Sequence, residues 1–506
     1  MSHRKRHLTS SPGCLSPHHH KRRPSSAAGD EDDLRRRPLP TFPSYLDDPD
    51  LPPKPRLLCS ILASSSSSPS STVASLDDSG VAVSPSDVEL VLRLSYSHPF
   101  PSLAFFRWSS SRLLPPHTRH SPYSYNLLVD LLGKNQLFDP MWDVVNSMRA
   151  EGILSLATFA SIFSSLAAAD RPDEAVSAFL SMPLHGVPRD TPALNSLLSA
   201  LCRAGRTTDA RGALPRVRSE AGVSPDADSF AILLEGCENE SDYRAARPVF
   251  DEMVKTVGWD PVNVPAYDSF LTTLVRSNPS GLSEAMRFFE IMQHNRCFPG
   301  IKFFRAALQA YVDTRDARGA AGLWEVLSRQ GRCLADTNMY NSMISLHGYL
   351  QQTDAAIRCL DEMVLHGAFP DSQTYNVLLQ FLLKSRKLRE AAAIFIEMVK
   401  NECCPSHCNC VTAVRIFIDT GDWKMGVKVW KCMVANNLQP FEESGNMLVA
   451  KLRDMDLLPE ACKIAEDMID RGIKLSSSTL SKLKHSLLKV GKGSIHDHLL
   501  RKWKSH

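Results

Sequence analysis

Four methionines that lie 35 residues apart show that much of this chain repeats one unit, because each ends a copy of the same helical pattern: Met363, Met398, Met433 and Met468. In the copy over residues 372–406, apolar residues recur at the spacing of one helix face, in two segments separated by polar residues 385–387. The first segment holds Tyr375, Leu378, Leu379 and Leu382, and the second holds Leu388, Ala391, Phe395 and Met398. Two helices of this size cannot bury their own apolar faces, so each pair must stack on its neighbours.

The same unit can be followed in both directions along the chain. Each copy opens with a core residue, usually aromatic, and then a variable one: Tyr125 and Asn126, Phe159 and Ala160, Leu194 and Asn195, Phe230 and Ala231, Tyr267 and Asp268, Phe304 and Arg305, Tyr340 and Asn341, Tyr375 and Asn376, Cys410 and Val411, and Gly445 and Asn446. Glycines such as Gly222 and Gly472 follow the second helices, and prolines such as Pro370 prevent continuation. The sequence therefore predicts an all-α solenoid of about ten tandem two-helix repeats over residues 122–476.

Composition excludes several other classes of protein. The 13 cysteines are odd in number and scattered, which favours free thiols over a disulfide framework. No apolar run approaches the roughly 18 residues of a membrane span, so we expect no membrane partner. The formal net charge of +3 neither demands nor excludes a nucleic-acid partner.

The segments that flank the repeats differ in kind. Residues 1–85 contain a serine run and dense prolines, and we interpret them as disordered. Before Asp30 this segment has six basic residues and no acidic one, as in a mitochondrial transit peptide, although a nuclear or a chloroplast address has similar features. Helical periodicity in residues 86–121 predicts an N-terminal helical cap. Residues 477–506 are expected to form a half repeat with leucines at 480, 483 and 487, followed by a basic tail.

The repeats resemble pentatricopeptide repeats, and the chain is similar to the pure P subclass of plant organelles. The family signature opens with Thr-Tyr-Asn, as in residues 374–376, and ends with Gly and Pro-Asp, as at Gly367, Pro370 and Asp371. The opening motif of the tetratricopeptide repeat, which has a similar period, does not appear in these units. The resemblance implies a right-handed superhelix that binds single-stranded RNA, with one base read by each repeat.

The resemblance also assigns the residues that read bases. In the family, the residue after the opening aromatic and the last residue of the repeat do most of the reading, and an Asn amide offers a donor and an acceptor together. Two units then look like uracil readers, and three look like weaker pyrimidine readers. The uracil readers are Asn195 with Asp226 and Asn341 with Asp371; the others are Asn126 with Ser155, Asn376 with Ser406 and Asn446 with Ser476.

The remaining five units depart from this pattern. Ala160, Ala231 and Val411 offer no base-pairing group, Asp268 is paired with Gly300, and Arg305 with Asp336. The family usually places Val where it wedges between bases, but here that position holds Pro192, Asn338, Gln373 and Glu443. Basic residues near the ends of four first helices are candidates for phosphate contact, although a solvated helix end explains them equally: Lys134, Arg203, Arg276 and Lys384.

No catalytic motif accompanies the repeats. The His-x-Glu and Pro-Cys-x-x-Cys of a zinc deaminase do not occur, nor does a Walker loop or His-Glu-x-x-His. Cys403, Cys404, His407, Cys408 and Cys410 are close in sequence, but Cys410 occupies a core position, so we expect no metal site. We therefore expect no enzyme activity, no cofactor and no small-molecule substrate.

The sequence leaves two functions open. The first is sequence-selective binding of an organellar transcript in RNA processing, stability, splicing or translation, with other RNA-processing proteins as further partners. The alternative is a protein-binding scaffold on the same fold, in a ribosome-associated or nuclear complex. The low net charge and the five units without a readable pair favour the alternative.

Overall fold

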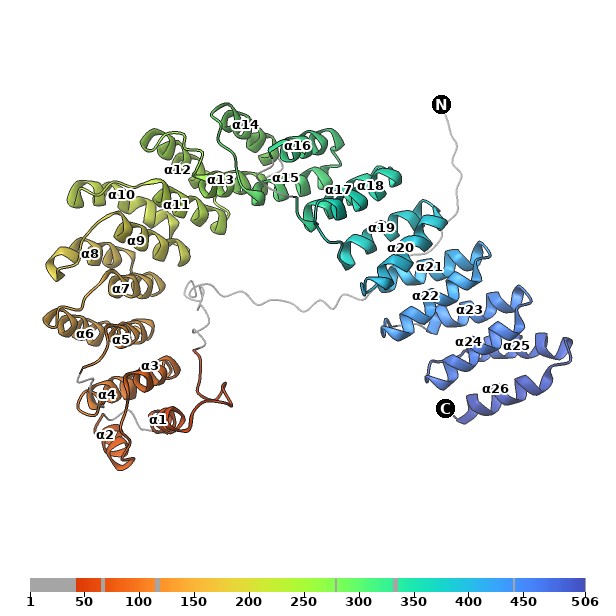
Figure 1. Cartoon of the computed structure of the whole chain (residues 1–506), viewed down its shortest axis with the longest axis horizontal. Helices are drawn as coiled ribbons and strands as arrows, with labels where there is room; N and C mark the ends of the chain where they lie inside the picture. The colour runs from red at the N-terminus through yellow and green to blue at the C-terminus, as the bar shows by residue number, and fades with distance from the viewer. Residues whose placement is uncertain are drawn as a thin grey trace, which may run out of the picture.

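The computed structural model describes residues 42–64, 69–113, 119–277, 280–330, 335–439 and 442–505. Within these ranges the regular structure is helical, apart from one isolated bridge between Val83 and Leu113. The helices follow one another in a curved row from the N-terminal to the C-terminal end (Figure 1). The predicted all-α solenoid is therefore confirmed.

Ten helix pairs make up the predicted repeat array. Their first helices are α5 (Pro122–Lys134), α7 (Leu156–Ala168), α9 (Thr191–Arg203), α11 (Ala227–Glu240), α13 (Val264–Ser277), α15 (Ile301–Thr314), α17 (Thr337–Tyr349), α19 (Ser372–Lys384), α21 (His407–Asp419) and α23 (Glu442–Asp454). Their second helices are α6 (Phe138–Ala150), α8 (Pro172–Ser181), α10 (Thr207–Ala221), α12 (Tyr243–Thr256), α14 (Gly281–His294), α16 (Ala317–Gln330), α18 (Thr353–Leu365), α20 (Leu388–Lys400), α22 (Trp423–Ala435) and α24 (Leu458–Asp470). A 3-10 turn (Met182–His185) extends α8. We number these pairs as units 1 to 10.

The backbone repeats with the same period as the sequence. A residue with a left-handed backbone ends the second helices at Gly367, Glu402, Asn437 and Gly472, and these four positions are 35 residues apart. Two of them are glycine, which adopts this conformation without strain, and the other two are not. The turn is therefore kept even where its preferred residue is absent.

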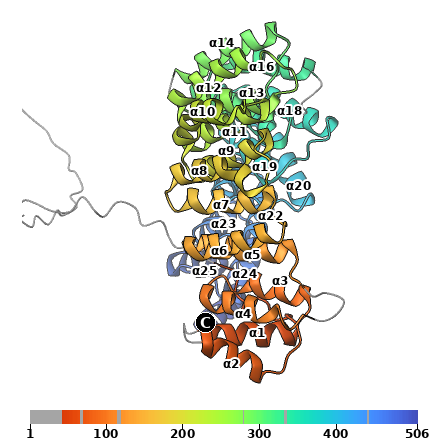
Figure 2. The same ribbon diagram turned by 90° about the vertical axis from the view of Figure 1, so that its left-hand side faces the viewer.

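Each first helix packs on the first helix of the next unit, so that these helices form a continuous layer from α5 to α25. The second helices lie outside this layer, mostly against the first helices of their own and the next unit. From α5 to α18 in Figure 1 the first helices face the inside of the curve. Figure 2 views the curve from its side, so that the C-terminal helices such as α23 and α25 lie behind the N-terminal ones.

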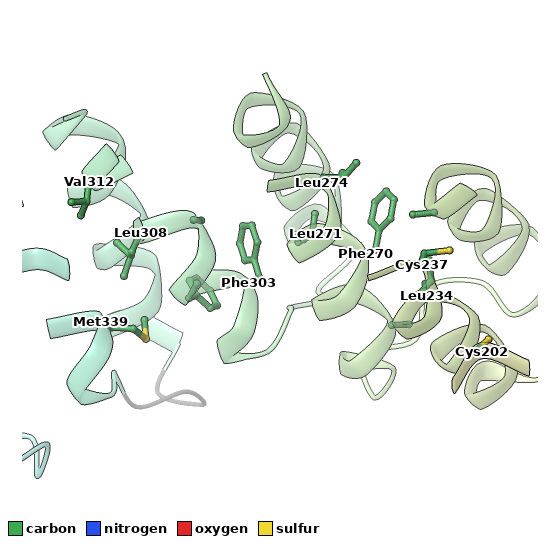
Figure 3. Close-up of a cluster of buried hydrophobic side chains, with 14 of the residues drawn as sticks. Cys202, Leu234, Cys237, Phe270, Leu271, Leu274, Phe303, Leu308, Val312 and Met339 are labelled. Atoms are coloured by element: carbon green, nitrogen blue, oxygen red, sulfur yellow. The ribbon is translucent and has the colours of Figure 1, made fainter. Parts of the chain in front are cut away.

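Apolar side chains fill the space between the two layers. Met363, Met398, Met433 and Met468 are fully buried, as predicted for core residues. Figure 3 shows how the core passes from one unit to the next through Leu234, Phe270, Phe303 and Met339. Because no unit closes a core of its own, each stabilises its neighbours.

The predicted disorder of residues 1–85 is wrong for part of that segment. Residues 1–41 lie outside the described residues, but α1 (Pro53–Ser64) and α2 (Pro69–Asp78) are helices. Leu58, Leu62 and Leu76 are fully buried in the same core as the predicted cap helices α3 (Pro85–Leu94) and α4 (Pro99–Ser109). The Trp108 indole of α4 donates to Asp77 of α2 at 2.7 Å. The cap is thus four helices and not two.

The C-terminal tail also folds further than predicted. After α25 (Ser477–Lys489), residues of the expected basic tail form α26 (Gly493–Ser505). Lys502 pairs with Glu466 and Asp470 of α24, and the Trp503 indole donates to the Leu475 carbonyl. The prediction of a half repeat was wrong, because α26 packs against α25 and α24 and so completes a helix pair. None of the described helices combines the length and the apolar character needed to cross a bilayer.

Candidate nucleic-acid interface

The five predicted base-reading asparagines occupy one position in the repeated architecture. Each is the fifth residue of a first helix: Asn126 of α5, Asn195 of α9, Asn341 of α17, Asn376 of α19 and Asn446 of α23. Because these helices form one layer and the asparagines share one helical position, the asparagines recur at one register along that layer. Four of them are half-buried, whereas the Asn341 side chain is only 3% exposed.

In units 3 and 7 the Asn amide is held at both ends by the next unit. The Asn195 amide nitrogen donates to Asp226 at 3.2 Å, and the Ser229 hydroxyl donates to the Asn195 oxygen. The Asn341 amide nitrogen donates to Asp371 at 3.3 Å, and the Thr374 hydroxyl donates to the Asn341 oxygen at 2.6 Å. The two sites have the same arrangement, and in each the Asn amide keeps one N–H donor and one oxygen lone pair that these two bonds do not use.

The two aspartates also cap helices. The Asp226 side chain accepts from the Ser229 backbone N–H at the start of α11, and Asp371 accepts from the Thr374 N–H at the start of α19. Burial acts to raise the pKa of each carboxyl, but these N–H bonds and the Asn and hydroxyl bonds outweigh it, and both pKa values lie below 3.8. Each carboxylate is therefore charged at neutral pH and fixes both a helix end and an amide.

Units 1, 8 and 10 hold their asparagines differently. The Asn126 oxygen accepts from the Thr158 hydroxyl at 2.7 Å. The Ser155 backbone N–H donates to the same hydroxyl oxygen at 3.4 Å, so Ser155 is linked to Asn126 through Thr158. In units 8 and 10 the serine contributes its backbone: the Ser406 N–H donates to Asn376 at 2.6 Å, and the Ser476 N–H donates to Asn446 at 2.8 Å. The serine hydroxyls cap helices α21 and α25 instead.

Unit 5 has exchanged the two roles. Asp268 stands at the base-reading position, but its carboxylate is buried and accepts the backbone N–H of Phe303 at 2.8 Å and of Lys302 at 3.4 Å, in the first turn of α15. The usual capping residue is Gly300, which has no side chain to cap with. Burial raises the pKa of Asp268, although the Phe303 N–H and Lys302 partly offset this. Sequence reasoning missed this cap, for which Gly300 was the available signal.

In unit 6 the two residues at the base-reading positions, Arg305 and Asp336, form an ion pair with each other. The family's usage assigns no base to this pair. Ala160, Ala231 and Val411 add only apolar surface to the track. At the wedge position, Tyr123 exposes half of its ring, a feature that the sequence analysis did not single out.

The four phosphate candidates share one position, the last or next-to-last residue of a first helix, about 12 Å along the axis from the amide. Lys134 is paired with Asp130 at 2.7 Å, and Arg276 with Glu238 at 3.3 Å. Arg203 and Lys384 are exposed and form no ion pair within the described part of the chain.

Two hollows follow this inner surface. The first, of about 670 Å³, is lined by residues that include Asn195, Ala231, Asp268 and Lys302, and the second, of about 950 Å³, by residues that include Lys302, Arg305 and Asn341. Since Lys302 lines both, they adjoin along the layer. Arg276, Lys302, Arg305 and Arg315 line the second hollow, together with the carboxylate of Asp313. Glu238 pairs with both Arg276 and Lys302, and Asp336 pairs with Arg305, so these acids neutralise part of the basic lining.

The cysteine cluster has no metal-binding geometry. Cys410 is a buried core residue whose pKa is raised by burial to about 12, whereas Cys404 and Cys408 are exposed. In the ranges that the structure describes, no three His, Cys, Asp or Glu side chains are arranged to hold a metal ion.

Comparison with known proteins gives matches in the repeat array. The model of the PPR repeat matches residues 123–153, 193–218 and 373–403, and that of the PPR repeat family matches residues 335–384. A mitochondrial pentatricopeptide repeat-containing protein of Arabidopsis thaliana is 33% identical over 32% of this chain and 31% of its own length. A second mitochondrial relative from the same plant is 32% identical over 39% of this chain and 35% of its own length. This chain therefore covers about a third of these two relatives.

Two further similarities extend over more of the chain. Another Arabidopsis thaliana pentatricopeptide repeat-containing protein is 23% identical over 78% of both chains. Among solved structures, the pentatricopeptide repeat protein PPR10 in complex with an 18-nt psaJ RNA element is 18% identical, with a TM-score of 0.41, over 89% of this chain and 68% of that one.

Proposed function

Because the repeats of this chain belong to the pentatricopeptide repeat family, we propose that the chain binds single-stranded RNA along its inner helical layer. The observation that carries the proposal is the common register of five Asn amides on the first helices. In units 3 and 7 a carboxylate and a hydroxyl fix the amide from the next unit. Amides in one register, separated by whole numbers of repeats, suit the bases of a single strand when each repeat reads one base.

The free groups of these two amides can bond to the edge of a base. Each keeps one N–H and one lone pair after its internal bonds are made. Every base offers an acceptor beside a donor on its Watson–Crick edge, so the amide alone does not choose among the bases. The family's usage of Asn with Asp selects uracil for these units. Asn126, Asn446 and the phosphate candidates Arg203 and Lys384 extend the same interface.

Two relatives support the biological setting that we propose. We place the chain in the pure P subclass, without catalytic activity, acting on a mitochondrial transcript, since two of its relatives carry the word mitochondrial in their names. By occupying single-stranded RNA it would protect an end, assist splicing or expose a translation start. The basic residues that suggest a transit peptide lie outside the described residues.

Binding of pooled single-stranded RNA to the full chain tests the proposal. The double variant N195A/N341A removes two fixed amides and should weaken binding by about 2 kcal/mol in total, or about 30-fold. The matched control N295A/N436A removes two exposed asparagines from the ends of second helices and should bind like the unaltered chain. Binding should also weaken as salt rises, because phosphates are neutralised.

Equal binding by both double variants would contradict sequence-selective reading and favour the protein-binding scaffold. Circular dichroism of both variants should show unchanged helix content, and this control matters most for N341A, because Asn341 is buried.

A further inference from the structure

We propose that Asn409 takes the last free hydrogen-bonding group of the Asn376 side chain and so closes unit 8 to RNA. Asn376 then does not read a base, although the residue pair of this unit matches that of a base-reading unit. The inference rests on the proposed function and concerns which units contribute to specificity. Asn409 lies at the start of α21, in the third helical position, where Ser229 and Thr374 stand in the readers of units 3 and 7.

All hydrogen-bonding groups of the Asn376 amide are occupied within the protein. Its nitrogen donates to the Ser372 carbonyl at 2.7 Å and to the Cys404 carbonyl at 3.1 Å. Its oxygen accepts from the Ser406 N–H at 2.6 Å and from the Asn409 amide at 3.1 Å. A primary amide has two donors and two lone pairs, so nothing remains for a base.

Asn409 is fixed in this role by its own surroundings. Its side-chain nitrogen also donates to the Asn376 backbone carbonyl at 2.7 Å, and the residue is only 7% exposed. A base that approached Asn376 would have to displace at least two of these bonds, and the groups released would be left without partners.

Unit 10 shows that the serine pairing alone does not close a unit. The Asn446 nitrogen is likewise occupied by two carbonyls, Glu442 and Lys474, and its oxygen accepts from the Ser476 N–H. There the third helical position holds Thr479, whose hydroxyl bonds with Ser476 and not with Asn446. Asn446 therefore keeps a lone pair, and the difference between the two units is Asn409.

The position of the closed unit can be recognised in a bound RNA. Asn195 and Asn341 belong to units 3 and 7, so the bases they read lie four positions apart. Unit 8 corresponds to the position next to the base of Asn341, on the side away from that of Asn195. Selection of RNA from a random pool by the full chain reports a preference at each position.

A double-mutant cycle on the best selected RNA tests the inference. In the unaltered chain N376A should change affinity less than twofold, whereas in the N409T background, which copies Thr479 of unit 10, it should weaken binding at least fivefold. Both N–H groups of Asn376 stay bonded to carbonyls, so the opened unit offers one lone pair, and N409T should gain a preference at the unit 8 position for a base that presents an N–H group. N409S, which has the same hydroxyl on a smaller side chain, gives a second opened variant, and thermal melting should show both variants folded.

The inference is overturned if N376A weakens binding by the unaltered chain as much as N195A does, or if N409T and N409S leave the unit 8 position without preference. Failure of the proposed function would give a different result, because N195A and N341A would then have no effect on RNA binding in any background.

Discussion

The exchanged cap in unit 5 allows a double-mutant cycle that probes the interface between two repeats. Asp268 of α13 caps α15 from the preceding unit, and Gly300 leaves room for it. A Cβ placed on Gly300 would lie 2.5 Å from the Asp268 carboxylate oxygen. The variant D268N/G300D should return the capping carboxylate to residue 300 and a reading amide to residue 268, as in units 3 and 7.

The magnitudes follow from the groups that are disturbed. D268N replaces the carboxylate that accepts the Phe303 and Lys302 N–H groups by a neutral amide oxygen, and the weaker acceptor costs about 1 kcal/mol. G300D alone forces a second carboxylate against Asp268, and overpacking alone costs about 1 to 3 kcal/mol. The double variant removes this conflict, so its destabilisation should fall short of the sum of the single variants by about 1 kcal/mol or more.

Hydrogen exchange of the backbone amides at the start of α15 is the direct assay, because unfolding of a repeat array is not a single transition. Amides of residues 302–304 should exchange faster in D268N and G300D than in the unaltered chain, and should recover protection in D268N/G300D. D336A, which removes a local cap of α17, serves as the reference for an ordinary cap. Additive effects of D268N and G300D would refute the exchanged roles.

Three further predictions follow from the same contacts. Replacing Arg203 and Lys384 by Gln should reduce the salt dependence of log affinity by about 1.4, at about 0.7 per single-strand phosphate contact, whereas K400Q/K428Q on second helices should leave the slope unchanged, as anisotropy titrations would show. The pKa values of Asp226 and Asp371 are lowered in the folded chain, so the stability that their charged forms contribute is fully present above about pH 4 and is lost as pH falls through the lowered folded pKa. RNA affinity should therefore stay constant from about pH 8 to about pH 5.5. A marked change in affinity over that range would contradict the roles assigned to these two aspartates. G348A should lower the melting temperature by the equivalent of about 1 to 3 kcal/mol, because its Cβ would meet the buried Phe381 ring at 2.1 Å, while G322A, with open space, should be neutral or slightly stabilising.

The period of the sequence was enough to predict the ten helix pairs and the common position of the five asparagines, because both depend on spacing along the chain. Met398 and Leu379 are fully buried, and they recur in the sequence because every copy of the unit buries the same positions. The helix α1 was missed because dense prolines precede its apolar residues and a serine run follows them. The helix α26 was missed because its polar partners, such as Glu466 for Lys502, lie in another segment.

The condition of each amide was not predictable from residue pairs alone. Asn376 and Asn446 have the same serine partner in sequence, yet the third helical position decides whether a lone pair remains. Asp268 looked like an unreadable base contact because its partners are backbone groups of the next unit. The family's usage assigns a base from two residues of a repeat, whereas the hydrogen bonds in these sites involve three or four residues.

Selection of RNA by the full chain, by N195A and by N341A is the most direct test of the central claim. The unaltered chain should enrich two pyrimidines separated by three less constrained positions, N195A should lose the preference at one of them, and N341A at the other. An enriched sequence with another spacing, or one that neither variant alters, would contradict base reading by the inner row of amides.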